Sequence, residues 1–165
     1  EELATFMGRH GALRFLGVHY GDSAAVLRQA RDRLADRRRL GAWVSGLTTL
    51  LESLYAQPLG YDETLRRKDA IIDSAQSWLR DNADTLFADT LYRGYAQARI
   101  TNAYLAIQKT YRRDLDLFER LLARYDGDLR RTLAAILPVK DRPEGVEPKE
   151  YLRELVGIGT DQAGS

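Results

Sequence analysis

Apolar residues recur every three or four positions along most of this chain, the spacing that places them on one face of an α-helix. The clearest run steps by four, four, three, four and three residues, through Ile107, Tyr111, Leu115, Phe118, Leu122 and Tyr125. The alternation of apolar and polar residues that is typical of strands is absent. The pattern therefore predicts an all-α fold, an array or bundle of about five to seven helices.

The first long helical pattern after the opening segment begins behind Asp22 and Ser23, either of which could cap a helix. Apolar residues then continue at helical spacing to Ala56, with one longer gap across the sequence DRRRL. An unbroken helix of that length would be about 50 Å long. The pattern therefore fits one very long helix, or two in tandem with a break between residues 37 and 41.

Turn and cap residues divide the rest of the chain. Pro58 and Gly60 predict a turn, after which Asp62 is expected to cap the next helix. Asp128 is expected to cap a short helix, and Pro148 to lie at an early position of the last one.

Length and composition agree with one folded domain. The chain has 165 residues, of which 44% are hydrophobic and 30% are charged, and a chain of this size can bury a core of its own. We therefore expect a single helical domain over residues 1–156 and a flexible tail at residues 157–165. No apolar run approaches the roughly 20 residues that cross a bilayer, so no membrane-spanning segment is expected in this chain.

The charge balance argues against nucleic acid as a partner. Lys and Arg together number 25 against 24 Asp and Glu, a net charge of +1, which leaves no global field to attract phosphates. The most basic stretch, RDRLADRRRL at residues 31–40, carries Asp32 and Asp36 among its arginines at helical spacing. We interpret it as a solvated helix face with local ion pairs.

Residues that could carry catalysis are few. The chain has no cysteine, which excludes a cysteine nucleophile and a thiolate zinc site. His10 and His19 lie nine residues apart, about half a turn out of register, so they cannot share a metal unless the helix breaks at Gly11 or Gly17. The motifs HExxH, G-x-S-x-G, G-x-G-x-x-G and the Walker loop are absent. Taken alone, the chain holds no complete catalytic set.

One polar residue lies within the strongest apolar pattern. Asn102, in the sequence ITNAYL, falls between Ile100 and Ala103, where an amide is costly unless it is hydrogen-bonded. It either makes a cap or a hydrogen bond between helices, or it lines a pocket between them.

Three blocks of the chain belong together. They are EELATFMGRHGALRFL at residues 1–16, LESLYAQPL with the following ETLRRKDAII at residues 51–72, and ITNAYLAIQKTYRRDLDLFERLLARYDGDLRRTLAAI at residues 100–136. In this order they resemble blocks of the bacterial predicted aminopeptidases, a family that is similar to the gluzincin zinc peptidases. In those enzymes the two histidines of HExxH bind zinc, and the glutamate between them is the general base. The succession of blocks is more specific than any one of them.

The resemblance implies a zinc ligand at the start of this chain. In the family, the glutamate of an N-E-x-x-A motif is the third zinc ligand, and aligning residues 4–6 (ATF) with the family places that ligand at Glu1. A register shifted by one residue would give the role to Glu2. Ala4 and Gly8 are small enough to let this helix approach the helix that carries the histidines.

Because HExxH is missing here, the resemblance implies that the chain is the helical C-terminal part of a longer zinc-dependent aminopeptidase. The full-length protein would hydrolyse peptide bonds with a zinc-activated water, whereas this part alone is expected neither to bind zinc nor to be active. Thr5, Asn102 and Tyr104 are candidates for lining the cleft that holds the peptide substrate. The resemblance also points to the bacterial envelope, while compartment and oligomeric state stay open.

An interpretation from a different class is a non-catalytic, all-α binding or scaffolding module. The residues upstream of Glu1 in the gene distinguish the peptidase interpretation from the module interpretation. An asparagine directly before Glu1, with HExxH further back, favours the peptidase, and their absence favours the module.

Overall fold

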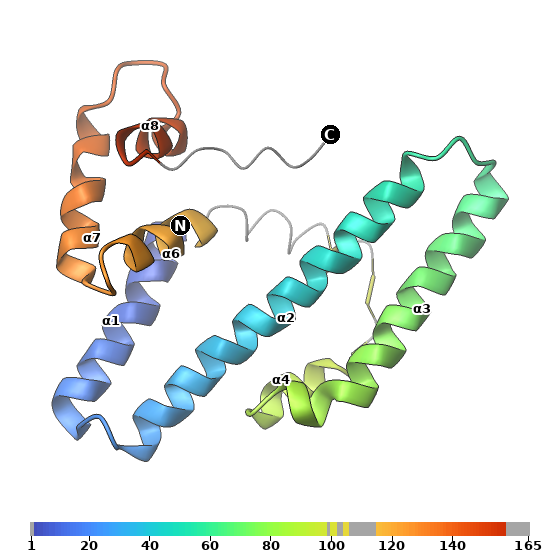
Figure 1. Ribbon diagram of the computed structural model, residues 1–165, viewed down its shortest axis with the longest axis horizontal. Coiled ribbons are helices and arrows are strands. Elements are labelled where there is room, and N and C mark those ends of the chain that lie inside the picture. Colours follow the sequence, from blue (N-terminus) through green and yellow to red (C-terminus); the bar gives the residue numbers. More distant parts are fainter. Residues whose placement is uncertain (1, 99, 102–103, 106–114, 158–165) are drawn as a thin grey trace. The chain divides into compact units, whose positions relative to one another are not determined.

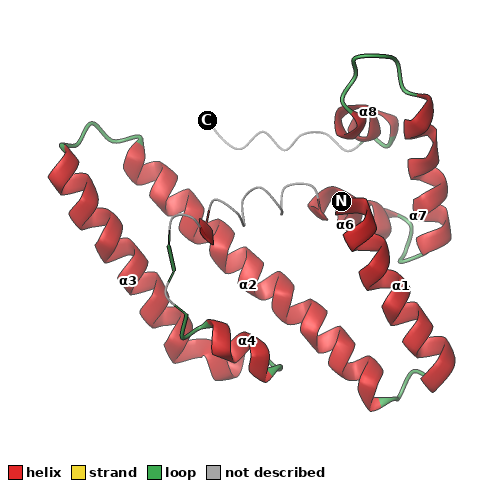
Figure 2. Ribbon diagram, turned by 180° about the vertical axis from the view of Figure 1, so that it is seen from behind, coloured by secondary structure: helices red, strands yellow, loops and turns green. Residues whose placement is uncertain are grey.

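The computed structural model describes residues 2–98, 100–101, 104–105 and 115–157 of the chain (Figure 1). Seven α-helices and one 3-10 helix have defined bounds in these residues, and none of them forms a strand (Figure 2). The elements are α1 Glu2–Tyr20, α2 Ala25–Tyr55, α3 Tyr61–Leu86, α4 Thr90–Tyr95, α6 Leu115–Arg124, α7 Leu129–Ile136, the 3-10 helix η1 Leu137–Asp141 and α8 Pro148–Leu155. The all-α prediction is confirmed.

The chain divides into two compact units. Residues 13–110 form one unit, and residues 1–12 together with residues 111–165 form the other. A single domain over residues 1–156 stays a prediction, as does the flexible tail, most of which lies outside the described residues. No helix in the described ranges combines the length and the apolar character that a membrane span requires.

In the unit of residues 13–110, α2 and α3 form an antiparallel hairpin that turns at Pro58 and Gly60, as predicted (Figure 1). Helix α2 has 31 residues and is about 46 Å long. It is a single helix, so the alternative with a break at residues 37–41 is wrong. Asp36, within the gap in the apolar pattern, and Gly41, directly after it, are both buried, so α2 packs continuously through this stretch.

Two cap predictions are wrong. Helix α2 begins behind Ala24, which makes no side-chain cap, so neither Asp22 nor Ser23 caps it. Helix α3 begins behind Gly60, which places Asp62 in the first turn instead of at the cap. A carboxylate in the first turn still interacts favourably with the positive end of the helix dipole.

The caps of the later helices are as predicted. The carboxylate of Asp128 accepts hydrogen bonds from the backbone N–H groups of Arg130, at 2.8 Å, and Arg131, at 3.1 Å, and so caps α7. Pro148 is the first residue of α8, where its fixed φ suits a helix and its missing N–H costs nothing.

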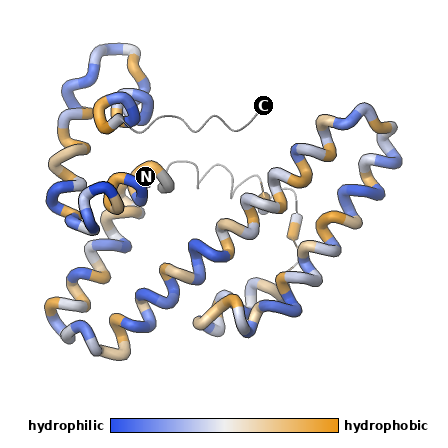
Figure 3. Tube along the Cα trace, in the orientation of Figure 1, coloured by the Kyte–Doolittle hydropathy of each residue, from blue (hydrophilic) through white to orange (hydrophobic). Residues whose placement is uncertain are grey.

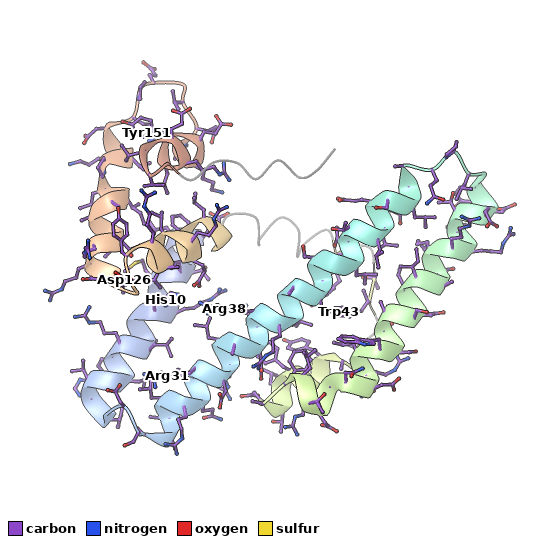
Figure 4. All side chains as sticks on the ribbon, in the orientation of Figure 1. His10, Arg31, Arg38, Trp43, Asp126 and Tyr151 are labelled. Carbon is purple, nitrogen blue, oxygen red and sulfur yellow. The ribbon has the colours of Figure 1, made fainter. Side chains whose placement is uncertain are left out.

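Two apolar clusters hold the hairpin unit. The first consists of Val44, Leu47, Leu51, Ile100 and Leu105, and the second of Leu79, Ala83, Phe87 and Ala96. Trp43, on α2, packs against both clusters (Figure 4). This shared side chain makes α2, α3 and α4 one packing unit.

The other unit has a core of its own. It consists of Phe6, Leu117, Phe118, Leu121, Leu122, Ile136, Leu152 and Val156, so α1, α6, α7 and α8 all contribute (Figure 3). The predicted apolar run is therefore confirmed at Phe118 and Leu122, which are buried. Ile107 and Tyr111, from the same run, lie outside the described residues.

Candidate functional site

The start of α1 is the candidate site that the sequence singles out. Glu1 lies outside the described residues, and Glu2 is the first residue of α1. Lys149 Nζ, on α8, donates to Glu2 Oε1 at 3.3 Å. A backbone hydrogen bond at Glu2 itself and the hydrogen bond from Lys149 lower the pKa of the Glu2 carboxyl below its ordinary value of 4.5. The Glu2 carboxylate is therefore a partner of α8.

One face of α1 packs into the core of its unit. Phe6 is fully buried, and its ring lies 5.6 Å from that of Phe118 on α6. Leu3 and Met7 pack against the same cluster. Burying an aromatic side chain is among the larger apolar contributions to stability, so this face fixes how α1 is rotated against α6.

His10 continues that face by one turn. Its Nε2 lies 2.9 Å from Glu119 Oε1 on α6, and its ring lies 4.7 Å from the ring of Phe6 (Figure 4). Only 12% of the His10 side chain is exposed. A histidine with a carboxylate partner and an aromatic neighbour is well ordered, and here it ties α1 to α6.

The other face of α1 carries small residues. Ala4, Gly8 and Ala12 are exposed, and a Cβ atom added at Gly8 or Gly11 would meet nothing within 4 Å. Among the described residues of this unit, none therefore needs the absence of a side chain at Gly8. Small residues on an open helix face permit the backbone of another element to approach closely.

The described part of the chain does not by itself fit a zinc site. No group of three or more His, Asp or Glu side chains in the described ranges is placed to hold a metal ion. His10 is engaged by Glu119, and His19, at the far end of α1, is exposed and contacts the tilted ring of Phe15 with 4.3 Å between ring centroids. Helix α1 also continues through Gly11 and Gly17, so the break that could have brought the histidines together is absent from it.

Two of the three predicted cleft residues lie in the described part of the chain. Thr5 is half-buried on α1, and Asn102 lies outside the described residues. Tyr104, in the unit of residues 13–110, is half-buried and packs against the cluster that contains Val44. Its backbone N–H donates to Thr101 Oγ1 at 3.2 Å. Whether these residues line a cleft stays a prediction.

Sequence reasoning missed an ionic network around two buried carboxylates in the hairpin unit. Asp36 is fully buried, and its carboxylate accepts from Arg39 Nη1 at 2.7 Å and from the backbone N–H of Asp89 at 2.8 Å. The Asp89 carboxylate in turn accepts from Arg33 Nε at 2.6 Å. The interpretation of the arginine-rich stretch as a solvated face is therefore wrong for Asp36. A signal was present, because Asp36 precedes Leu40 by four residues and so shares its face.

Comparison with known proteins identifies the family of this chain. The model of the family described as "Putative aminopeptidase" matches residues 1–152. Neither the curated proteins nor the solved structures contain a match to this chain. The match extends from the first turn of α1 into α8, through both compact units and every helix between them. The chain therefore belongs to the "Putative aminopeptidase" family.

Proposed function

We propose that this chain is the helical C-terminal part of a gluzincin-like, zinc-dependent aminopeptidase. The observation that carries the proposal is the family match over residues 1–152. The order of the family-like blocks along the sequence supports it. Zinc in such an enzyme supplies an activated water for hydrolysis of the peptide bond.

The role proposed for α1 is to bring a carboxylate to a zinc ion whose two histidine ligands come from an HExxH motif elsewhere in the full-length protein. Ala4 and Gly8, which follow Glu1 in the sequence by three and seven positions, form the small-residue face of α1. That face is exposed at both residues. A catalytic zinc site with two histidines and one carboxylate needs only one ligand, Glu1, from this chain.

Thr5, Asn102 and Tyr104 are retained as proposed cleft residues for a peptide substrate. Thr5 follows Glu1 by four positions, close enough in sequence to contact a substrate held at the metal. The described helices then act as walls that position the substrate, while the general base comes from HExxH.

The test is to express the full-length protein that contains this chain and to measure bound zinc together with hydrolysis of aminoacyl amides. The Glu1→Gln variant is expected to lose zinc and activity together, because glutamine removes the charged ligand while keeping the shape of the side chain. Glu144→Gln is the matched control, since Glu144 lies exposed in the loop before α8. It should retain both zinc and activity.

Full zinc content and full activity in Glu1→Gln would contradict the ligand assignment. A full-length protein that neither binds zinc nor hydrolyses aminoacyl amides would overturn the proposed function. That second outcome would favour the alternative, a non-catalytic all-α binding or scaffolding module.

A further inference from the structure

We propose that two polar pairs, Glu2 with Lys149 and His10 with Glu119, hold the first three turns of α1 from one side, and that Glu2 therefore serves as a positioning residue and not as a zinc ligand. The statement about zinc rests on the proposed function. The statement about the two pairs does not, because it concerns only contacts within the unit of residues 1–12 and 111–165.

Three residues on one face of α1 make the contacts that hold it. Glu2, Phe6 and His10 follow one another at intervals of four residues, so they lie within about 80° of arc on α1. Each makes a contact of its own: Glu2 with Lys149 of α8, Phe6 with Phe118 of α6, and His10 with Glu119 of α6. A buried ring with a polar pair on either side fixes both the rotation and the position of the helix along its axis.

The packing of Phe6 fixes how α1 is rotated about its axis. The small residues Ala4 and Gly8 lie on the opposite side of α1 from Phe6, by helical spacing and by exposure. Turning α1 so that Glu2 is aimed along the small-residue face would need a rotation of about 100° or more. Phe6 would then leave the core, which is unfavourable for so large an apolar side chain. The packed face thus excludes the register in which Glu2 is the ligand.

The positive charge of Lys149 disfavours a zinc ion at Glu2. The Lys149 ammonium lies 3.3 Å from Glu2 Oε1, so a zinc ion bound to the same carboxylate would lie within about 5 Å of a positive charge. Like charges at that distance repel, and the repulsion weakens metal binding. A carboxylate that already neutralises a lysine is a poor zinc ligand and a good link between helices.

Hydrogen exchange in the full-length protein tests the positioning role. Lys149→Met is expected to speed amide exchange in residues 2–12 by about two- to fivefold, the range typical of an exposed ion pair. The Lys140→Met control, at an exposed position of η1, should leave that exchange unchanged. Glu119→Gln should speed exchange in the same segment by a similar or larger factor, because the His10 pair is more buried.

Charge reversal separates a specific pair from general loss of structure. Lys149→Glu alone should speed exchange in residues 2–12, whereas Glu2→Lys combined with Lys149→Glu should restore most of the protection. Lys149→Arg should retain it as well. A double variant that exchanges faster than Lys149→Glu alone would overturn the positioning role. A Lys149→Met protein that exchanges like wild type would overturn it as well.

Zinc stoichiometry tests the assignment of the carboxylates. Glu2→Gln is expected to keep one zinc per full-length chain at saturating zinc, while Glu1→Gln loses it. Loss of zinc in Glu2→Gln with retention in Glu1→Gln would overturn the inference and leave the proposed function standing. If the wild type binds no zinc, the proposed function fails, and the exchange measurements still decide whether the two pairs position α1.

Discussion

The Oδ2 atom of Asp36 accepts a hydrogen bond from the backbone N–H of Asp89 at 2.8 Å, across 53 positions of sequence. Asp36 is fully buried on α2, and Asp89 is the residue that caps α4. The bond therefore joins the middle of α2 to the start of α4. A buried carboxylate is tolerated at such a place only when its oxygens are occupied, and Arg39 occupies the other one.

Replacing Asp36 with alanine should destabilise the hairpin unit. The change leaves the Asp89 N–H without its acceptor, and an unsatisfied buried donor costs about 1 to 3 kcal/mol, while the half-exposed Arg39 side chain can be solvated by water instead. Urea denaturation of the full chain measures the loss. The matched control is Asp32→Ala, because Asp32 is exposed on the same helix and should change stability little. Equal effects of the two variants would contradict this account.

Asp89 should make stability depend on pH in the acid range. The hydrogen bond from Arg33, and then that from the backbone N–H of Leu91, hold the pKa of Asp89 below its ordinary value of 3.8. A depressed carboxyl pKa contributes stability that is present above pH 3.8 and is lost as the pH falls through the pKa of the folded state. The urea midpoint of Asp89→Asn should thus lie below that of wild type at pH 7, and the gap should narrow below pH 3.8. A gap that stays constant down to strongly acid pH would show that the charge of Asp89 is not the cause.

Phe6→Ala should selectively loosen the unit formed by residues 1–12 and 111–165. Phe6 has no exposed surface and contacts Phe118, and truncating a buried phenylalanine costs about 3 to 5 kcal/mol. Hydrogen exchange should therefore speed up in α6 and α8, while the α2–α3 hairpin changes less. Phe15→Ala provides the comparison, since Phe15 lies on the same helix and is 56% exposed. If Phe15→Ala is as damaging as Phe6→Ala, burial is not what gives Phe6 its role.

Asp128→Ala should weaken the start of α7. The Asp128 carboxylate satisfies two backbone N–H groups there, and the loss of such a cap costs about 0.5 to 2 kcal/mol. Asp128→Asn should be much milder, because asparagine retains an oxygen that can accept the same hydrogen bonds. Thermal unfolding of the three proteins should therefore rank them as wild type, asparagine variant and alanine variant. Any other order would argue against the cap.

Among the features that depend on neighbouring residues alone, the starts of the later helices were predicted correctly, whereas the caps expected at Asp22 or Ser23 and at Asp62 were wrong. The start of α7 behind Asp128 and the start of α8 at Pro148 follow from capping and from the fixed φ of proline. The burial of Phe118 and Leu122 follows from helical spacing.

Features that depend on distant residues were predicted worst. The Asp36 carboxylate is buried because Asp89 and Arg39 satisfy it, and Asp89 is 53 positions away. When that partner is not known, an aspartate among arginines is interpreted as a surface residue. The gap that it leaves in the apolar pattern is then interpreted as a helix break. The same holds at the start of α1, where the role of Glu2 depends on Lys149, 147 positions later.

The assembly of one unit from residues 1–12 and residues 111–165 has a consequence for synthesis on the ribosome. The first turns of α1 are made before all of the α2–α3 hairpin, and their packing partners Leu152 and Val156 emerge only after residues 13–110 are complete. Phe6 therefore cannot reach these core partners until all of residues 13–110 have been made. The hairpin unit, whose contacts lie within a continuous stretch of chain, can fold in that interval.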